Sequence, residues 1–163
     1  MGKDSRKTLR ESLNVCSLPA ALEAMGERWS FLILRGSFNG LQHFEEFQAE
    51  LGIARNILAN RLARLVDHGI LERRPCHDDR RKVAYRLTDK GYALLPTMVA
   101  LRQWGECWET GVPAFPVLVD ARDNMPVRMI QVLSHDGRPL GRGELHWARP
   151  EDVAHEQEED SAA

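Results

Sequence analysis

The segment that decides the fold is HFEEFQAELGIARNILANRLARLVDHG, residues 43–69. Apolar residues recur at positions 44, 47 and 51, and again at 58, 62, 65 and 66, which is the spacing of amphipathic helices. The pattern predicts helices over 43–51 and 54–68, with Gly52 in the turn between them and Gly69 ending the second. Two short helices joined by a tight turn indicate a helix-turn-helix unit.

The flanking sequence predicts two helices before this unit and a hairpin after it. Ser17, with Pro19 in the first turn, favours a helix over 17–25, and the apolar run Phe31–Leu34 lies in a second, 29–38. Short strands over 70–74 and 83–87 bracket a charged connection, which predicts a β-hairpin with a basic tip. Thr88 and Asp89 then begin one long helix that extends to about Glu109.

Beyond this helix the pattern changes. Alternating runs over 125–134 and 138–147 flank Asp136-Gly137, a strong turn signal, and predict an appended β-hairpin. Residues 150–163 are acidic with almost nothing apolar, and should be disordered. The fold class expected is therefore α+β, mainly α.

The net charge of −2 combines two unlike parts of the 163-residue chain. Residues 1–105 hold 17 basic and 12 acidic side chains, a balance of +5, whereas residues 106–163 hold 5 and 12, a balance of −7. The bulk charge alone argues against nucleic-acid binding, but a basic body is compatible with it. No apolar run is long enough for a membrane span, and no signal-peptide core follows the charged start, so we expect a cytoplasmic protein that does not contact membranes.

Catalytic and metal chemistry find little support in the sequence. It has no phosphate-binding loop, nucleophile elbow or paired-carboxylate setting, so we expect no enzyme and no cofactor. Cys76-His77 with His68 lacks the spacing of a zinc site, so no metal is expected. Three scattered cysteines do not make a disulfide framework.

Several short motifs in series resemble the HxlR-type bacterial regulators, which are relatives of the MarR type. The resemblance covers about residues 16–108. It depends on Cys16, Gly26-Glu27-Arg28-Trp29 before Leu32-Ile33-Leu34-Arg35, His43-Phe44, the stretch from Ile53 to Gly69-Ile70-Leu71, Tyr85-Arg86-Leu87-Thr88, Gly91 and Trp104-Gly105. The sequence departs from the family at Ala54, where Ser or Thr is usual, and at His43, where Arg is usual. In the wing, Asp78-Asp79-Arg80-Arg81-Lys82 replaces a segment that contains proline in the family.

The resemblance implies a winged helix-turn-helix transcriptional regulator from a bacterium or archaeon that binds a pseudo-palindromic operator in double-stranded DNA as a homodimer. The predicted organisation is an arm (1–15), a DNA-binding and dimerisation domain (16–110) that ends in the long dimerisation helix, an extension (111–149) and the acidic tail (150–163). The helix 54–68 would lie in the major groove, and the wing near the backbone or minor groove.

Helical geometry then assigns the residues that contact DNA. With Leu58, Leu62 and Leu65 facing inward, a step of about 100° per residue directs Asn56 and Asn60 outward, and an asparagine amide pairs with adenine N6 and N7. Small residues allow close approach, and arginines position the protein on phosphates. The predicted DNA contacts are Arg55, Asn56, Ala59, Asn60, Arg61, Arg64, Arg80, Arg81, Lys82 and His43.

Two further groups of residues are predicted to serve assembly and sensing. The apolar face of the long helix is too large for one helix to hide, so helix 17–25 and this face are expected at the dimer interface, through Leu18, Leu22, Met98, Leu101, Trp104 and Trp108. Cys16 precedes a helix, where amides and Arg10 or Arg28 would stabilise a thiolate. In some members of the family that the sequence resembles, a cysteine at this position senses oxidants or electrophiles, and we expect Cys16 to be a candidate for this role. Cys107 of the other subunit is its expected partner. A small packing role for Cys16 is the alternative.

Other function classes stay open at this stage. One is a winged-helix module that binds proteins and has no affinity for DNA. Another is a small-molecule-binding protein in which the hairpin at 125–147 forms the wall of the pocket. For the regulator itself, the alternatives are a response to a small molecule, a response to an oxidant, and no effector.

Overall fold

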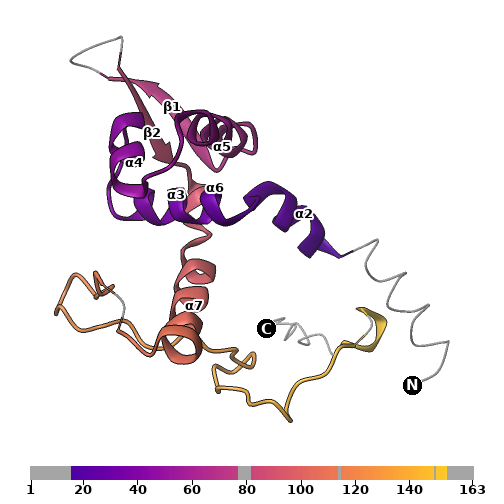
Figure 1. Cartoon of the computed structure of the whole chain (residues 1–163). Coiled ribbons are helices and arrows are strands. Elements are labelled where there is room, and N and C mark those ends of the chain that lie inside the picture. The colour runs from indigo at the N-terminus through magenta and orange to yellow at the C-terminus, as the bar shows by residue number, and fades with distance from the viewer. Residues whose placement is uncertain (1–15, 77–81, 114, 149, 154–163) are drawn as a thin grey trace, which may run out of the picture. The chain divides into compact units, whose positions relative to one another are not determined.

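The computed structural model describes residues 16–76, 82–113, 115–148 and 150–153 (Figure 1). The chain divides into two compact units, of which the first ends at Val117 and the second begins at Leu118. The regular elements of the first unit are α2 (Ser17–Met25), α3 (Arg28–Phe38), α4 (Phe44–Leu51), α5 (Arg55–Asp67), β1 (Leu71–Pro75), β2 (Val83–Leu87), α6 (Asp89–Tyr92) and α7 (Leu95–Gly105). A π-helix, Glu106–Thr110, follows α7. These bounds confirm the predicted helices and the first hairpin to within one or two residues as far as α6. Within the described residues no helix is long and apolar enough to cross a bilayer.

The core forms where α3, α4 and α5 meet the start of β1. Leu58, Leu62 and Leu65 on α5 have no exposed surface, which confirms the inward stripe predicted from their spacing. Phe47 of α4 is equally buried against them. The rest of the buried cluster consists of Ile33, Leu34, Ile53, Ile70 and Leu71.

Two glycines end the helices of the helix-turn-helix unit. Gly52 has φ +59° and Gly69 has φ +66°, a left-handed conformation that side-chain-bearing residues rarely adopt. Ala54, the residue before α5, makes no side-chain hydrogen bond, as expected from its missing hydroxyl. The start of α5 is therefore held by packing of Ile53, which is 2% exposed.

The strands β1 and β2 form an antiparallel hairpin, called the wing below, with Leu71 opposite Leu87 and Pro75 opposite Val83. The wing is attached to the segment before α4, because the N–H of Tyr85 donates to the carbonyl of Gln42 at 2.7 Å and His43 bridges to Ala84. The helix-turn-helix and the wing are consequently one structural body. Arg80 and Arg81, which the sequence predicts at the tip of the wing, lie outside the described residues.

The single long helix predicted over 88–109 is wrong. Thr88 caps α6 as expected, accepting from the N–H of Gly91 at 3.1 Å, but the helix ends at Tyr92 and α7 begins at Leu95. Pro96 explains the break, because it lacks the N–H that would bond to Tyr92 in a continuous helix and its ring would clash there. After Gly105 the backbone widens into the π-helix.

The second unit corrects the other strand predictions. The turn at Asp136-Gly137 forms, with the N–H of Ser134 donating to the carbonyl of Arg138 at 2.9 Å, but its flanks pair through one bridge, Leu133 to Pro139, and not as two long strands. Proline at 126 and 139 removes backbone donors that a strand ladder needs.

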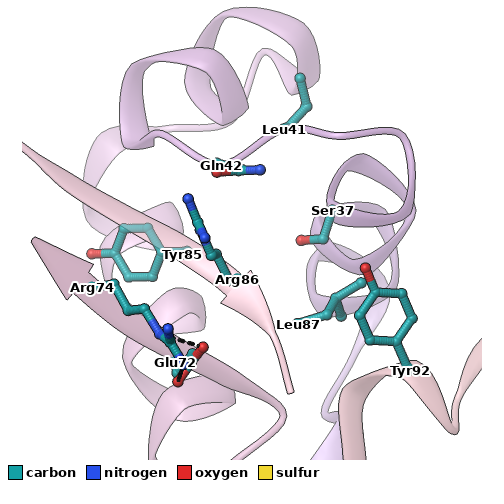
Figure 2. A pocket seen from close by; sticks show the side chains of 9 residues that line it. All are labelled: Ser37, Leu41, Gln42, Glu72, Arg74, Tyr85, Arg86, Leu87 and Tyr92. Carbon is teal, nitrogen blue, oxygen red and sulfur yellow. Dashed lines mark hydrogen bonds and ion pairs between the residues drawn. The ribbon is translucent and has the colours of Figure 1, made fainter. Parts of the chain in front are cut away.

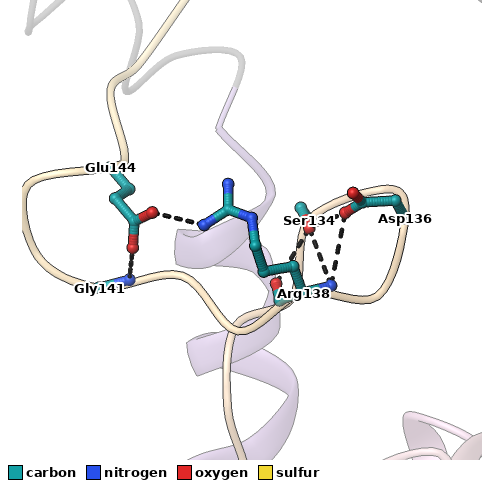
Figure 3. A network of polar contacts seen from close by, with 5 residues as sticks. All are labelled: Ser134, Asp136, Arg138, Gly141 and Glu144. Atoms are coloured by element: carbon teal, nitrogen blue, oxygen red, sulfur yellow. Dashed lines mark hydrogen bonds and ion pairs between the residues drawn. The ribbon is translucent and has the colours of Figure 1, made fainter.

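Side chains hold this turn instead (Figure 3). The hydroxyl of Ser134 donates to the Asp136 carboxylate, and Arg138 pairs with Glu144, which also accepts from the N–H of Gly141 at 2.7 Å. That N–H and the Arg138 guanidinium lower the pKa of Glu144.

The chain ends differ in what the structure describes of them. Pro150–Asp152 forms one turn of 3-10 helix, so the predicted disorder is wrong for these three residues. Residues 154–163 and the predicted arm, 1–15, lie outside the described residues.

Candidate nucleic-acid interface

The outward face of α5 carries short polar and small side chains. Asn56, Ala59, Asn60 and Ala63 are all exposed, as the predicted helical geometry requires. Among the described residues, neither asparagine amide has an intramolecular hydrogen bond. Two amides one helical turn apart are therefore available to an external partner.

Arg55 begins α5 and is exposed, with its guanidinium 4.8 Å from the centre of the Phe44 ring. This stacking holds Arg55 in the lining of a hollow of about 500 Å³, here called the helix-end hollow. The helix-end hollow lies between the amino-terminal ends of α4 and α5 and strand β2. Its lining residues are His43, Phe44, Glu45, Glu46, Arg55, Lys82, Val83 and Tyr85. Lys82 is exposed beside it.

His43 serves as a connector in this hollow. Its Nδ1 lies 3.1 Å from the carbonyl oxygen of Val83, and since that oxygen only accepts, Nδ1 donates. The backbone N–H groups of Gln42 and His43 both donate to one oxygen of Glu46, at 2.8 and 2.9 Å. These two bonds lower the pKa of Glu46 and close the first turn of α4. His43, a predicted DNA contact, is thus also a link between α4 and the wing.

Arg61 and Arg64 point from α5 toward the amino-terminal helices. Arg61 Nε is 2.7 Å from the carboxylate of Glu27, and Arg64 Nη2 is 3.0 Å from the carboxylate of Glu23 and 3.2 Å from its carbonyl oxygen. Sequence reasoning missed both acids, because they lie more than 30 positions away along the chain. In this structure the two arginines attach α2 and the start of α3 to the helix that carries Asn56 and Asn60.

The ion pair of Arg64 with Glu23 allows a direct test of whether Arg64 links α5 to α2 or binds DNA phosphate. Replacing either with glutamine should lower the free energy of unfolding by less than about 1 kcal/mol, since the pair is largely exposed. The double variant should lose no more than the larger single loss, because each change removes the same ion pair. Urea unfolding measures the cycle.

Glu50→Gln is the matched control, because Glu50 is exposed on α4 and has no ion pair with a described residue. Its effect should add to that of Arg64→Gln. If Arg64 is instead a phosphate ligand, Arg64→Gln reduces the salt dependence of DNA binding by about one unit and shows no coupling to Glu23.

Exposed apolar side chains gather on α2 and on the last turns of the α7 segment. Leu18, Leu22, Leu101 and Trp104 are each 51–57% exposed, and Trp108 is 76% exposed. Met98 differs from this set, because it is partly buried against the core of its own chain. Exposed apolar side chains of this size are typical of association surfaces.

The cysteines of the described residues are unpaired. Cys16 is exposed immediately before α2, and Cys107 is exposed in the π-helix. Cys16 is the capping position of α2, and Ser17 is the first residue of the helix. Arg28, one of two predicted neighbours of the thiolate, has its guanidinium 4.9 Å from the centre of the Trp29 ring. No group of three potential metal ligands occurs within the described ranges, and His77 lies outside them.

A helix-turn-helix whose first helix is tied to an antiparallel hairpin defines the winged helix-turn-helix class of proteins. Residues 24–112 match the model of the HxlR-like helix-turn-helix family. The chain belongs to this family of transcriptional regulators, as the motif series predicts.

Known proteins agree with this assignment. The HTH-type transcriptional regulator Rv3095 of Mycobacterium tuberculosis is 43% identical over 90 residues, which cover 55% of this chain and only 57% of that regulator. The crystal structure of the candidate transcription factor PA1607 is 42% identical and superposes with a TM-score of 0.75 over 82% of this chain and 94% of its own. The oxidised form of the redox regulator HypR is 28% identical, with a TM-score of 0.54 over 58% of this chain and 99% of its own.

Proposed function

We propose that this protein is a transcriptional regulator that binds a pseudo-palindromic operator in double-stranded DNA as a homodimer. The observation that carries the proposal is the outward face of α5, where two unpartnered asparagine amides stand among alanines in a winged helix-turn-helix fold. Action on chromosomal DNA would place the protein in the cytoplasm.

Base contacts and phosphate contacts would come from different residues. Asn56 and Asn60 would pair with adenine edges in the major groove, with Ala59 and Ala63 close to thymine methyl groups. Arg55, held on Phe44, and Lys82 flank the helix-end hollow and would bind the backbone. Arg80 and Arg81 remain predicted wing contacts with the minor groove.

The homodimer would use the exposed apolar face of α2 and α7. Two copies related by a two-fold axis present two α5 helices about 34 Å apart, which matches successive major grooves on one side of the duplex. Leu18, Leu22, Leu101, Trp104 and Trp108 would be buried in this interface, with Met98 at its inner edge. The net negative charge of residues 106–163 would limit non-specific binding to DNA.

Titration of the full chain against labelled DNA tests the proposal. Fluorescence anisotropy with the region upstream of its own gene should show saturable binding that weakens steeply as salt rises, and that exceeds binding to a scrambled duplex by at least about 10³-fold. Sedimentation should give a particle of twice 18.5 kDa. Equal affinity for both duplexes would end the regulator proposal, and absence of any DNA affinity would favour the protein-binding or small-molecule module.

Redox control is a second candidate function, favoured by the exposed Cys16 next to α2 and by the likeness to HypR. Cys16 and the partner's Cys107 would form a disulfide by losing two protons and two electrons to hydrogen peroxide, which is reduced to water. Mild peroxide should give a covalent dimer on non-reducing gels and change DNA affinity. Cys16→Ser should abolish both effects and Cys76→Ser neither. Identical DNA binding before and after oxidation would exclude this function.

A further inference from the structure

A second hollow, of about 440 Å³, lies at the base of the wing and is called the wing-base hollow (Figure 2). It is bounded by the end of α3, the connection to α4, both strands and α6. The lining residues are Ser37, Leu41, Gln42, Glu72, Arg74, Tyr85, Arg86, Leu87 and Tyr92. A volume of this size holds a small organic molecule.

Three charged side chains line this hollow, and only two of them, Glu72 and Arg74, form an ion pair with each other. Arg86 stands directly opposite Glu72 in the strand register, which is the position of a cross-strand ion pair. Glu72 is nevertheless taken by Arg74, whose Nε and Nη2 lie 2.6 and 3.1 Å from its two oxygens. Among the described residues the guanidinium of Arg86 has no ion pair or hydrogen bond, and in Figure 2 it extends toward Gln42.

The other free polar groups of the hollow are donors or can act as donors. Neither the side-chain amide of Gln42 nor the hydroxyl of Tyr92 has a hydrogen bond within the described part of the chain. Tyr92 also presents a ring that is 59% exposed and is fixed edge-on against Phe38, with ring centres 6.1 Å apart. The guanidinium of Arg86 and the amide of Gln42 therefore lie together on one side of the hollow, and the ring of Tyr92 lies on the other side, beside Leu87 and Ser37 (Figure 2).

We propose that the wing-base hollow binds a small aromatic carboxylate. The guanidinium of Arg86 would donate two parallel hydrogen bonds to the carboxylate oxygens, and the amide of Gln42 would donate to the same group. The ligand ring would lie against Tyr92 and Leu87, which supply the apolar part of the lining. A neutral amide of the same shape would leave the charge of Arg86 uncompensated and would bind more weakly.

This site is separate from the proposed DNA contacts. The wing-base hollow shares only Tyr85 with the helix-end hollow, and it contains none of the exposed residues of α5. A bound ligand would connect β2 to α3 and α6, and so would set the position of the wing. That regulatory consequence rests on the proposed function, whereas ligand binding does not and is tested without DNA.

The test uses the full chain labelled with ¹⁵N and titrated with benzoate, with benzamide as the neutral isostere. Benzoate should shift the amide resonances of Ser37, Gln42, Arg86 and Tyr92 along saturable curves, with an affinity at least about tenfold above that for benzamide. Arg86→Gln should reduce benzoate affinity at least about tenfold, and Arg86→Lys should retain part of it, because lysine keeps the charge and loses the planar fork.

Arg73→Gln is the matched control, because Arg73 is an exposed arginine of β1 outside the hollow, without an ion pair among the described residues. It should bind benzoate like the wild type. Unchanged benzoate affinity in Arg86→Gln, equal binding of benzoate and benzamide, or no saturable shift up to about 20 mM would each overturn the proposal. A folded spectrum for each variant shows that the loss is not caused by unfolding.

Discussion

Replacing Asn60 with alanine should weaken binding to the operator by about 5- to 150-fold. This is the factor that corresponds to the 1–3 kcal/mol of one bidentate contact between an amide and adenine. Affinity for non-operator duplexes should hardly change, because the amide contributes no charge to the phosphate contacts. Anisotropy titrations with operator and scrambled DNA at one stated salt concentration measure both effects.

Stability separates this loss from misfolding. Asn60 is exposed in the middle of α5, so alanine should raise the free energy of unfolding by up to about 0.5 kcal/mol through helix propensity. Asn39→Ala is the matched control, since Asn39 is exposed at the end of α3 and its side chain donates only to the carbonyl of Arg35, at 2.7 Å. Its operator affinity should stay at the wild-type value. An equal loss from both variants, or none from Asn60→Ala, would contradict the assignment of Asn60.

Replacing Gly91 with alanine should destabilise the protein by about 1–3 kcal/mol. A Cβ atom there would lie 2.3 Å from the carbonyl oxygen of Ile70 and 2.9 Å from a methyl group of Leu87. That carbonyl accepts the N–H of Thr88 at 3.2 Å, so the backbone of α6 and the residue before β1 are in direct contact. The chain has to separate at this junction to admit a methyl group.

Urea unfolding at a fixed protein concentration measures the effect, with Gly105→Ala as the matched control. A Cβ at Gly105 meets nothing within 4 Å, so the same substitution there should stabilise α7 by up to about 1 kcal/mol. The two variants should shift the midpoint in opposite directions. A neutral or stabilising Gly91→Ala would mean that this junction is not close-packed.

The sequence alone could predict the elements whose periodicity is local. The stripe of Leu58, Leu62 and Leu65 determined both the extent of α5 and its buried face, because a helix repeats every 3.6 residues whatever surrounds it. The break before α7 was also visible in the sequence, since Pro96 cannot continue a helix. The apolar face by itself favours one continuous helix, but the missing backbone donor of Pro96 prevents it.

Other features depend on contacts that no local pattern contains. The alternation over 125–147 is typical of a strand, but a strand needs a partner ladder, and prolines at 126 and 139 interrupt one here. Arg61 and Arg64 were assigned to DNA from their helix face, whereas their acidic neighbours come from α2 and the residue before α3. The spacing of His43 and Glu46 was the available signal for the closed first turn of α4.

The free edge of β1 bears on the resistance of the protein to aggregation at high local concentration. β1 pairs only with β2 among the described strands, so its outer row of backbone groups is a template for another chain. Arg73 and Arg74 put charge on this edge, and Pro75 removes a donor from it. Both features disfavour pairing of the wings of neighbouring molecules into a continuous sheet, which is the first step toward aggregation.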